Sequence, residues 1–510
     1  MAGAAPHVMV LPFPAQGHVT PLMELSHRLV DHGLRVTFVC TEPIRKLLLD
    51  ALADNKKALD GIRLVSVPDG LADGDSHRDL GKVLAGVLGR VPGYVEELIR
   101  KAEASEEKKV RWLVADATMA CCFQAARSLG VRVASVCPSS AACLVTSLRI
   151  PQLIQDGFFD DKVSNLLPQR NAVFFDPIDK PKRAGFPKRH GTFELAPGMP
   201  PLRPTQMTWN IDGALEGRRA AFELAFGIAQ VTDLAEIVMC NSFHEAETGA
   251  FELCPDIMPI GPLFADQELR KPVGQFWPED ASCLEWLDAQ PEGSVVYVAF
   301  GSFTIFDPRQ FRELAEGLEL TGRPFLWVVR PDFTSGGLSK AWFDEFQKRV
   351  AGIGMIVSWC PQQQVRTRCT AKNCSIMSCV LGSSHDLHAI STDMQVLAHP
   401  AVACFVSHCG WNSTMEGVRN GVPIVCWPYF SDQFANQSYI CDIWRTGLDV
   451  THGDDGVVTK EEVKDKLERL TGDKGIAERA RMLRDAARKS VNEGGSSYEN
   501  FKRFVDLLTE

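Results

Sequence analysis

Short, continuous apolar runs alternate with segments of helical periodicity along the first part of the chain. In the first such segment, leucines three or four positions apart predict a helix over 21–32, which Gly33 ends. Strands that are apolar throughout and are connected by helices are typical of a parallel sheet covered on both faces. The strands predicted in this part are 7–13, 34–40, 111–115 and 131–137.

The same alternation starts again in the second half of the chain. Between the two halves, 261–280 is rich in proline, glycine and polar residues and is predicted to be a linker. We therefore predict an α/β protein with two Rossmann-like domains, 1–260 and 281–495, facing one another across a cleft. In such sheets ligands bind beyond the carboxyl ends of the strands. The strands predicted in the second half are 294–300, 325–329, 355–358, 403–407 and 423–427.

Composition and charge narrow the class of protein without identifying it. The 510 residues are 45% hydrophobic and 23% charged, which is ordinary for a globular chain and excludes a disordered or collagen-like one. The formal net charge of −10 argues against nucleic acid or an anionic membrane surface as a partner. We expect no membrane span and no signal peptide, because long apolar runs and a basic N-terminal region are both missing. The 16 cysteines are scattered without a CxxC pair, so we expect reduced thiols and a cytoplasmic protein.

Two residues with acid–base chemistry follow predicted strands of the first domain. His18 lies on the loop after the first strand, and imidazole is well suited to accept a proton near neutral pH. Asp116 comes directly after the strand at 111–115, and a carboxylate beside His18 would fix its tautomer and stabilise its cation. Spacing alone favours a plain structural role for each of the two.

The segment 408–413, HCGWNS, follows a predicted strand of the second domain and opens a helix. Free backbone N–H groups at a helix N-terminus form a phosphate site, although the same pattern also fits a capped helix start. Glu416 could accept hydrogen bonds from a ribose, and Asp432 and Gln433 from sugar hydroxyls. Trp359 follows another strand and offers a flat face on which a base could stack.

A long motif in the second domain resembles the signature of the plant family 1 UDP-sugar glycosyltransferases. It consists of WCPQQQ at 359–364 and VLAHPAVACFVSHCGWNSTMEGVRNGVPIVCWPYFSDQ at 396–433. The segment LAPGMPPL at 195–202 favours the group 83 branch of this family. The resemblance implies a GT-B fold, with the acceptor in the N-terminal domain and the UDP-sugar in the C-terminal one. It also implies that a last helix, 496–510, packs back on the N-terminal domain.

Carried over residue by residue, the resemblance implies the following roles. His18 is the general base of an inverting transfer and Asp116 its partner. Gln433 goes with glucose, which favours UDP-glucose as the donor. For the acceptors, the family resemblance favours small hydrophobic, hydroxylated plant metabolites, phenolics such as flavonoids or monolignols. No metal or other cofactor is implied. The donor contacts are Trp359 and Cys360 at uracil, Gln362 and Glu416 at ribose, Ser302, His408, Asn412 and Ser413 at the diphosphate, and Trp411, Asp432 and Gln433 at the sugar.

The signature is interrupted by 31 residues, 365–395, whose removal joins WCPQQQ directly to VLAHP. The segment begins with Val-Arg and ends with Met-Gln, which codons typical of intron ends can encode. We hypothesise a retained intron or an error in the gene model, the alternative being a real surface insertion. A second, weaker candidate is 163–184. An alternative function is therefore a UDP-binding but catalytically impaired splice form.

Overall fold

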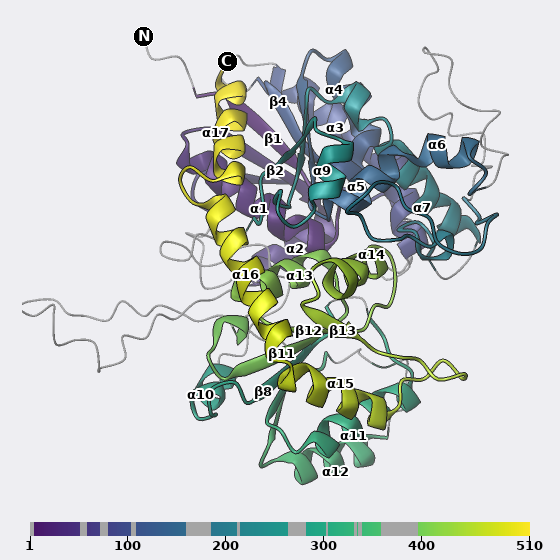
Figure 1. The fold of residues 1–510 in the computed structure, drawn as a ribbon. Coiled ribbons are helices and arrows are strands. Elements are labelled where there is room, and N and C mark those ends of the chain that lie inside the picture. The colour runs from purple at the N-terminus through teal and green to yellow at the C-terminus, as the bar shows by residue number, and fades with distance from the viewer. Residues whose placement is uncertain are drawn as a thin grey trace, which may run out of the picture.

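The computed structural model folds into two parallel β-sheets with helices packed around each (Figure 1). The predicted α/β architecture of two Rossmann-like domains is therefore confirmed. The structure describes residues 5–51, 59–71, 80–103, 109–159, 185–211, 215–263, 282–301, 304–330, 334, 339–358 and 396–510. Among these residues, no helix combines the length and the apolar character that a bilayer span requires.

The N-terminal sheet has seven strands in the order β3-β2-β1-β4-β5-β6-β7. The predicted strands are present as β1, β2, β4 and β5, with ends shifted by one or two residues, whereas β3, β6 and β7 were not predicted. The bounds are β1 (His7–Leu11), β2 (Arg35–Thr41), β3 (Ile62–Val67), β4 (Trp112–Asp116), β5 (Arg132–Cys137), β6 (Ile237–Cys240) and β7 (Ile257–Pro259).

The C-terminal sheet has six strands in the order β10-β9-β8-β11-β12-β13, of which only β13 was not predicted. Because both sheets are parallel, the carboxyl ends of neighbouring strands open at the same edge. The bounds are β8 (Val295–Ala299), β9 (Phe325–Val328), β10 (Gly354–Val357), β11 (Val402–Ser407), β12 (Ile424–Cys426) and β13 (Gly447–Asp449).

Helices connect the strands and cover both faces of each sheet (Figure 1). The helices of the N-terminal half are α1 (Gln16–Asp31), α2 (Glu42–Ala51), α3 (Leu80–Glu103), α4 (Phe123–Ser128), α5 (Ala141–Leu148), α6 (Ile150–Gln155), α7 (Leu215–Ile228), α8 (Val231–Leu234) and α9 (Thr248–Leu253). Those of the C-terminal half are α10 (Ser282–Asp288), α11 (Pro308–Thr321), α12 (Lys340–Val350), α13 (Trp411–Asn420), α14 (Gln433–Ser438), α15 (Lys460–Gly472), α16 (Lys474–Val491) and α17 (Ser496–Thr509).

Successive residues of one strand enter different cores, which explains why the strands are apolar throughout. In β1, Val8 and Val10 belong to the cluster that includes α1 and α17, whereas Met9 and Leu11 belong to the cluster that includes α3 and α5. Side chains on a strand point alternately to its two faces, so a sheet covered on both sides needs an uninterrupted apolar sequence.

The chain ends on the N-terminal domain after crossing from the C-terminal one (Figure 1). In Figure 1, α16 runs upward between the two sheets and α17 lies beside α1. Phe504 and Leu508 of α17 are buried in the same cluster as α1. Asn500 Nδ2 donates a hydrogen bond to the Pro259 carbonyl oxygen at 2.9 Å. The last helix therefore ties the two halves of the chain together.

Candidate active site

A cavity of about 320 Å³ lies between the two domains and is lined by residues of both. Its N-terminal wall comes from the ends of β1, β4 and β5 together with α5 and α7. Its C-terminal wall comes from the loop after β11, the start of α13 and the loop before α14. All nine of the predicted site residues that the structure describes line this cavity: His18, Asp116, His408, Trp411, Asn412, Ser413, Glu416, Asp432 and Gln433.

The structure brings His18 and Asp116 together in one corner of the cavity. Because β1 and β4 are parallel neighbours, the first turn of α1 after β1 lies next to the last residue of β4. His18 Nδ1 is 2.7 Å from Asp116 Oδ2. The His18 side chain is 28% exposed toward the cavity, whereas that of Asp116 is fully buried. Nδ1 is thus occupied by the carboxylate, and Nε2 is the nitrogen left for a reacting group.

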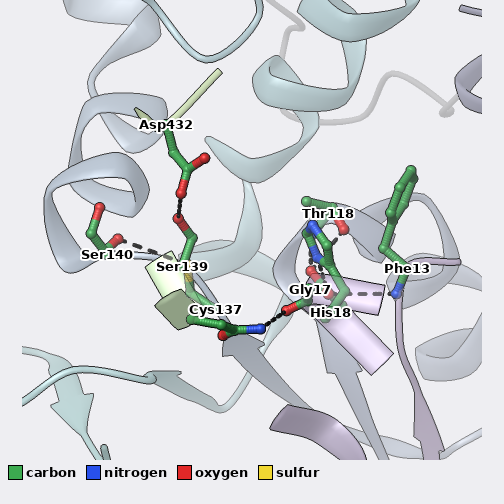
Figure 2. Close-up of polar contacts among 10 residues, drawn as sticks. Phe13, Gly17, His18, Thr118, Cys137, Ser139, Ser140 and Asp432 are labelled. Carbon is green, nitrogen blue, oxygen red and sulfur yellow. Dashed lines mark hydrogen bonds and ion pairs between the residues drawn. The ribbon is translucent and has the colours of Figure 1, made fainter. Parts of the chain in front are cut away.

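Other groups hold the Asp116 carboxylate in this orientation. Its Oδ1 accepts hydrogen bonds from the Thr118 backbone N–H at 2.9 Å and from the Thr118 hydroxyl at 2.7 Å. The backbone N–H of Phe13 lies 3.4 Å from Oδ2 (Figure 2). A buried carboxylate with several donors keeps one rotamer, so it fixes the tautomer and the ring plane of His18.

The surroundings of His18 favour its protonated form. Burial alone would lower the pKa of His18, but the charge and hydrogen bond of Asp116, with a smaller effect of Asp432, outweigh burial and raise it above 6.5. A proton arriving at His18 is therefore stabilised where it lands. The dyad can accept a proton from a hydroxyl group placed at Nε2.

The N-terminus of α13 forms the opposite wall of the cavity. Gly410 precedes the helix without a side-chain cap, so the first backbone N–H groups of α13 are available to an anion. His408 lies beside them with its Nδ1 buried and without a hydrogen-bond partner among the described residues. Burial, with a smaller effect of the Arg330 charge, lowers the pKa of His408 to about 4. His408 is therefore a neutral hydrogen-bond donor at pH 7, not a cation.

Two glycines leave the space that the His408 ring occupies. A Cβ atom would lie 2.7 Å from His408 Nε2 if added to Gly301, and 2.5 Å if added to Gly410. Gly301 also has a φ of 65°, which disfavours any residue with a side chain. The loops after β8 and β11 therefore approach each other only because both carry glycine here.

Asn412 connects the C-terminal wall of the cavity to the first turn of α1, which carries His18. Its Nδ2 donates a hydrogen bond to the Gly17 carbonyl oxygen at 2.9 Å. That oxygen is free to accept because Pro21, four residues further along α1, has no N–H to offer it. A helix interrupted by proline thus presents a backbone acceptor to the other domain, next to the proposed base.

The loop before α14 carries Asp432 and Gln433. Asp432 Oδ2 accepts hydrogen bonds from the Ser139 hydroxyl at 3.2 Å and from Asn436 Nδ2 at 2.9 Å. Figure 2 shows Asp432 pointing across the domain boundary toward Ser139. Gln433 Oε1 accepts the backbone N–H groups of Tyr429 and Phe430 at 2.7 and 3.0 Å, which leaves its NH₂ group for a ligand.

The buried residues of α13 contact the cavity in different ways. The Trp411 indole N–H donates to the Asn241 carbonyl oxygen at 2.7 Å, and the side chain is only 3% exposed. The indole N–H of Trp411 is therefore not available to a ligand in the cavity. Ser413 and Glu416 also line the cavity from the same helix, although Glu416 is largely buried.

Four predicted donor contacts lie outside the described residues: Ser302, Trp359, Cys360 and Gln362. The suspected insertions 163–184 and 365–395 and most of the predicted linker 261–280 also lie outside them. The uracil half of the predicted donor site therefore stays a prediction from the sequence.

The part of the cavity that the N-terminal domain lines is mostly apolar. Beyond His18, the residues of the N-terminal wall include no lysine and no arginine among those the structure describes. A wall of this kind suits an apolar body that carries few polar groups. The apolar lining side chains are Phe13, Leu84, Leu144, Trp209, Ile211, Ala221, Leu224, Ala225 and Ile228.

Sequence reasoning missed residues that act across the domain boundary. Ser139 contacts Asp432 from a position 293 residues away in the chain, and Asn241 contacts Trp411 from 170 residues away. Neither lies in a motif, and no local pattern marks them. Their importance follows only from the way the two domains meet.

Comparison with known proteins identifies relatives along the whole chain. The family model "UDP-glucoronosyl and UDP-glucosyl transferase" matches residues 380–485. UDP-glycosyltransferase 83A1 of Arabidopsis thaliana is 36% identical over 514 residues, which cover 99% of this chain and 97% of that protein. A 7-deoxyloganetin glucosyltransferase of Catharanthus roseus is 31% identical and covers 99% of this chain and 96% of its own length.

Solved structures give the same result for the fold. Os79 from O. sativa in complex with UDP superposes with a TM-score of 0.73 at 27% identity, covering 98% of this chain and all of that one. The same rice protein, in a complex with U2F and a trichothecene, gives a TM-score of 0.71 at 28% identity. This chain therefore shares the GT-B fold of these neighbours.

Proposed function

This chain belongs to the plant family 1 UDP-sugar glycosyltransferases and is similar to group 83, and on that premise we propose that it transfers glucose from UDP-glucose, with inversion, to a hydroxyl group of a small hydrophobic acceptor. The observation that carries this proposal is the His18–Asp116 pair, which lies in a cavity with an apolar half and a helix N-terminus without a side-chain cap. Among hydroxylated acceptors, we propose phenolics.

In the proposed mechanism, His18 removes the proton of the acceptor hydroxyl. Nδ1 is held by Asp116, so the lone pair that takes the proton is on Nε2. Asp116 stabilises the imidazolium that forms. A phenol, with a pKa of about 10, gives up its proton to this base more easily than an aliphatic alcohol does. The acceptor oxygen then attacks the anomeric carbon on the face opposite UDP, which inverts its configuration.

Negative charge develops on the departing diphosphate. The free N–H groups at the start of α13 and the neutral His408 are placed to donate hydrogen bonds to it. Asp432 and the NH₂ group of Gln433 would meet the hydroxyls of the sugar. The mechanism therefore needs no metal ion for leaving-group stabilisation, because backbone donors take that role.

The proposal is tested with two donors and two acceptors. The purified chain is incubated with UDP-glucose or UDP-galactose, and with a neutral phenol or the same phenol bearing a sulfonate. We expect a glucoside of the neutral phenol in the product mass spectrum and much slower reaction for the other three combinations. Preference for the sulfonated phenol would contradict the acceptor class, and preference for UDP-galactose would contradict the donor.

Replacing Gly410 by alanine should weaken donor binding. The added Cβ would lie 2.5 Å from His408 Nε2, so the ring must leave its position beside the start of α13. Loss of one hydrogen bond to a charged phosphate predicts a rise of about 10- to 100-fold in the KM for UDP-glucose. The matched control is Gly89→Ala in α3, where an added Cβ meets nothing within 4 Å. An unchanged KM in Gly410→Ala would remove His408 from the donor site.

Deleting 365–395 tests whether the interruption of the signature matters. The deletion rejoins WCPQQQ to VLAHP and restores the continuous family motif. The family-model match begins at 380, within this segment, and leaves 359–364 outside. Since ~1 Å of displacement of a binding group can cost ~100-fold in rate, we expect the deletion variant to turn over faster, by up to about that factor. Equal rates for the two proteins would contradict the interruption hypothesis.

A further inference from the structure

The segment 241–247, which follows β6, connects the C-terminal domain to the acceptor side of the cavity. Its backbone accepts two indole hydrogen bonds: Trp411 Nε1 donates to the Asn241 oxygen at 2.7 Å, and Trp444 Nε1 donates to the Ala246 oxygen at 2.8 Å. The rings of Trp411, Trp444 and Tyr439 form a buried cluster, with centroids of neighbouring rings 6.3 and 5.5 Å apart. Through Trp411, the segment therefore contacts α13, the helix whose N-terminus lines the cavity.

At the end of this segment, Glu247 closes the N-terminus of α5. Its side chain is fully buried. Oε2 accepts the backbone N–H of Ala141 at 2.7 Å, and Oε1 accepts that of Ala142 at 2.9 Å. The Ser140 hydroxyl accepts the next one, from Cys143, at 3.2 Å. A carboxylate 106 residues away in sequence therefore satisfies two of the otherwise free N–H groups of this helix and lies at the positive end of its dipole.

The start of α5 carries residues of both halves of the proposed reaction. Ser139, just before the helix, donates its hydroxyl hydrogen bond to Asp432 at 3.2 Å (Figure 2). The Ser139 carbonyl oxygen is itself contacted by Cys240 Sγ at 3.3 Å, at the end of β6. Cys143, Leu144 and Ser147 of α5 line the cavity. Any movement of the first turn of α5 therefore displaces both the cavity-lining residues of α5 and Ser139, the hydrogen-bond donor to Asp432.

We propose that Glu247 is a positioning residue for glycosyl transfer. It holds the first turn of α5 in place, and this turn in turn fixes the acceptor side of the cavity relative to Asp432. Glu247 touches neither substrate and acts through Ala141, Ala142 and Ser139. The expected kinetic effect rests on the proposed function. The two hydrogen bonds from the backbone of α5 to Glu247 are present in the free protein, whatever its function.

The direct test is Glu247→Gln in the full chain. Glutamine keeps the shape of the side chain but presents an NH₂ group to one of the two backbone N–H donors, so one hydrogen bond is lost. We expect kcat/KM for the acceptor to fall by about 10- to 100-fold, with a higher acceptor KM, because the wall of the cavity is displaced. The affinity for UDP alone, measured by calorimetry, should stay within about twofold, since the proposed UDP contacts lie on the other domain. Glu245→Gln, an exposed glutamate of the same segment, should behave as the wild type.

Hydrogen exchange separates the failure of this inference from the failure of the proposed function. The amides of Ala141 and Ala142 should exchange faster in Glu247→Gln than in the wild type, whether or not the protein transfers glucose. Unchanged exchange, or kinetics equal to those of the wild type, would overturn the inference. A parallel loss of transfer and UDP affinity would also overturn it, because that pattern reports a reduced folded fraction. Absence of transfer by both the wild type and the variant lacking 365–395 would contradict the proposed function alone.

A second variant keeps the test decisive if Glu247→Gln does not fold. Trp444→Phe removes the hydrogen bond to the Ala246 oxygen but keeps an aromatic ring in the cluster. We expect the same rise in the acceptor KM, of smaller size, with UDP affinity unchanged. An acceptor KM equal to that of the wild type would show that segment 241–247 does not position α5.

Discussion

Alanine in place of His18 is expected to lower kcat by about 10²- to 10⁴-fold, the range typical of a lost general base. His18 Nδ1 is held at 2.7 Å by Asp116, and no other histidine lines the N-terminal wall of the cavity among the residues described. Without the imidazole, the acceptor hydroxyl must lose its proton to water. The effect should be larger for an aliphatic alcohol than for a phenol, because the phenol ionises on its own more readily.

Initial rates of glucoside formation measure this effect, with UDP affinity as a check on folding. His452→Ala, which removes an exposed histidine on the loop before α15, is the matched control and should leave kcat unchanged. A His18→Ala protein that binds UDP and transfers glucose at the wild-type rate would contradict the assignment of the base.

Asparagine in place of Asp116 should have the second largest effect and should also change the pH dependence. Neutral His18 is the active base, so the rate falls as pH drops through the pKa of His18, which lies above 6.5 in the wild type. The Asp116 charge and hydrogen bond are the causes that raise this pKa, while burial opposes them. Removing the charge leaves burial as the larger influence, so the acid limb of the profile should move to lower pH. At the optimum, kcat should still fall by about 10²- to 10⁴-fold, because the imidazolium loses its stabilising partner.

The measurement is kcat/KM for the acceptor between pH 5 and 9 in the wild type and in Asp116→Asn. Melting temperature and UDP affinity show whether the buried substitution has damaged the fold, since Asp116 also accepts hydrogen bonds from Thr118. An acid limb that stays in place in Asp116→Asn would mean that His18 is not the group that titrates. A limb shifted to higher pH would contradict the electrostatic role given to Asp116.

Continuous apolar runs predicted most of the strands because both faces of each sheet are buried. Strand β6, with the sequence IVMC, has this pattern and is buried throughout, but it was missed. The other strands that escaped prediction do not show the pattern. In β3 the middle residues are only partly buried and two polar residues, Arg63 and Ser66, interrupt the apolar ones, as suits the edge of a sheet. Strands β7 and β13 have only three residues each, too few for any periodicity. The sequence alone cannot distinguish such segments from loops.

Helix α1 shows how a tertiary contact changes a local prediction. The periodicity predicted a start at 21, but the helix begins at Gln16 and contains Pro21. The missing N–H of Pro21 is tolerated because Asn412 of the other domain supplies a donor to the Gly17 oxygen. That donor lies 395 residues away in the chain, so no sequence window around Pro21 contains it.

The candidate site also contains residues that a local motif predicts and residues that only long-range contacts reveal. The residues from His408 to Gln433 lie in one motif, and their places on the loop after β11, on α13 and before α14 could be predicted from it. Ser139, Asn241 and Glu247 could not, because each acts through a partner from a distant segment. A motif identifies the groups that meet a ligand, whereas the contacts that hold those groups in place appear only in the folded chain.

The most direct test of this account is the anomeric configuration of the product. The full chain and the variant lacking 365–395 are each incubated with UDP-glucose and a panel of neutral phenols, and the coupling constant of the anomeric proton is read by NMR. Attack by a base-activated acceptor oxygen opposite UDP predicts a β-glucoside from the α-linked donor. An α-glucoside, or the absence of any glucoside from both proteins, would contradict the account.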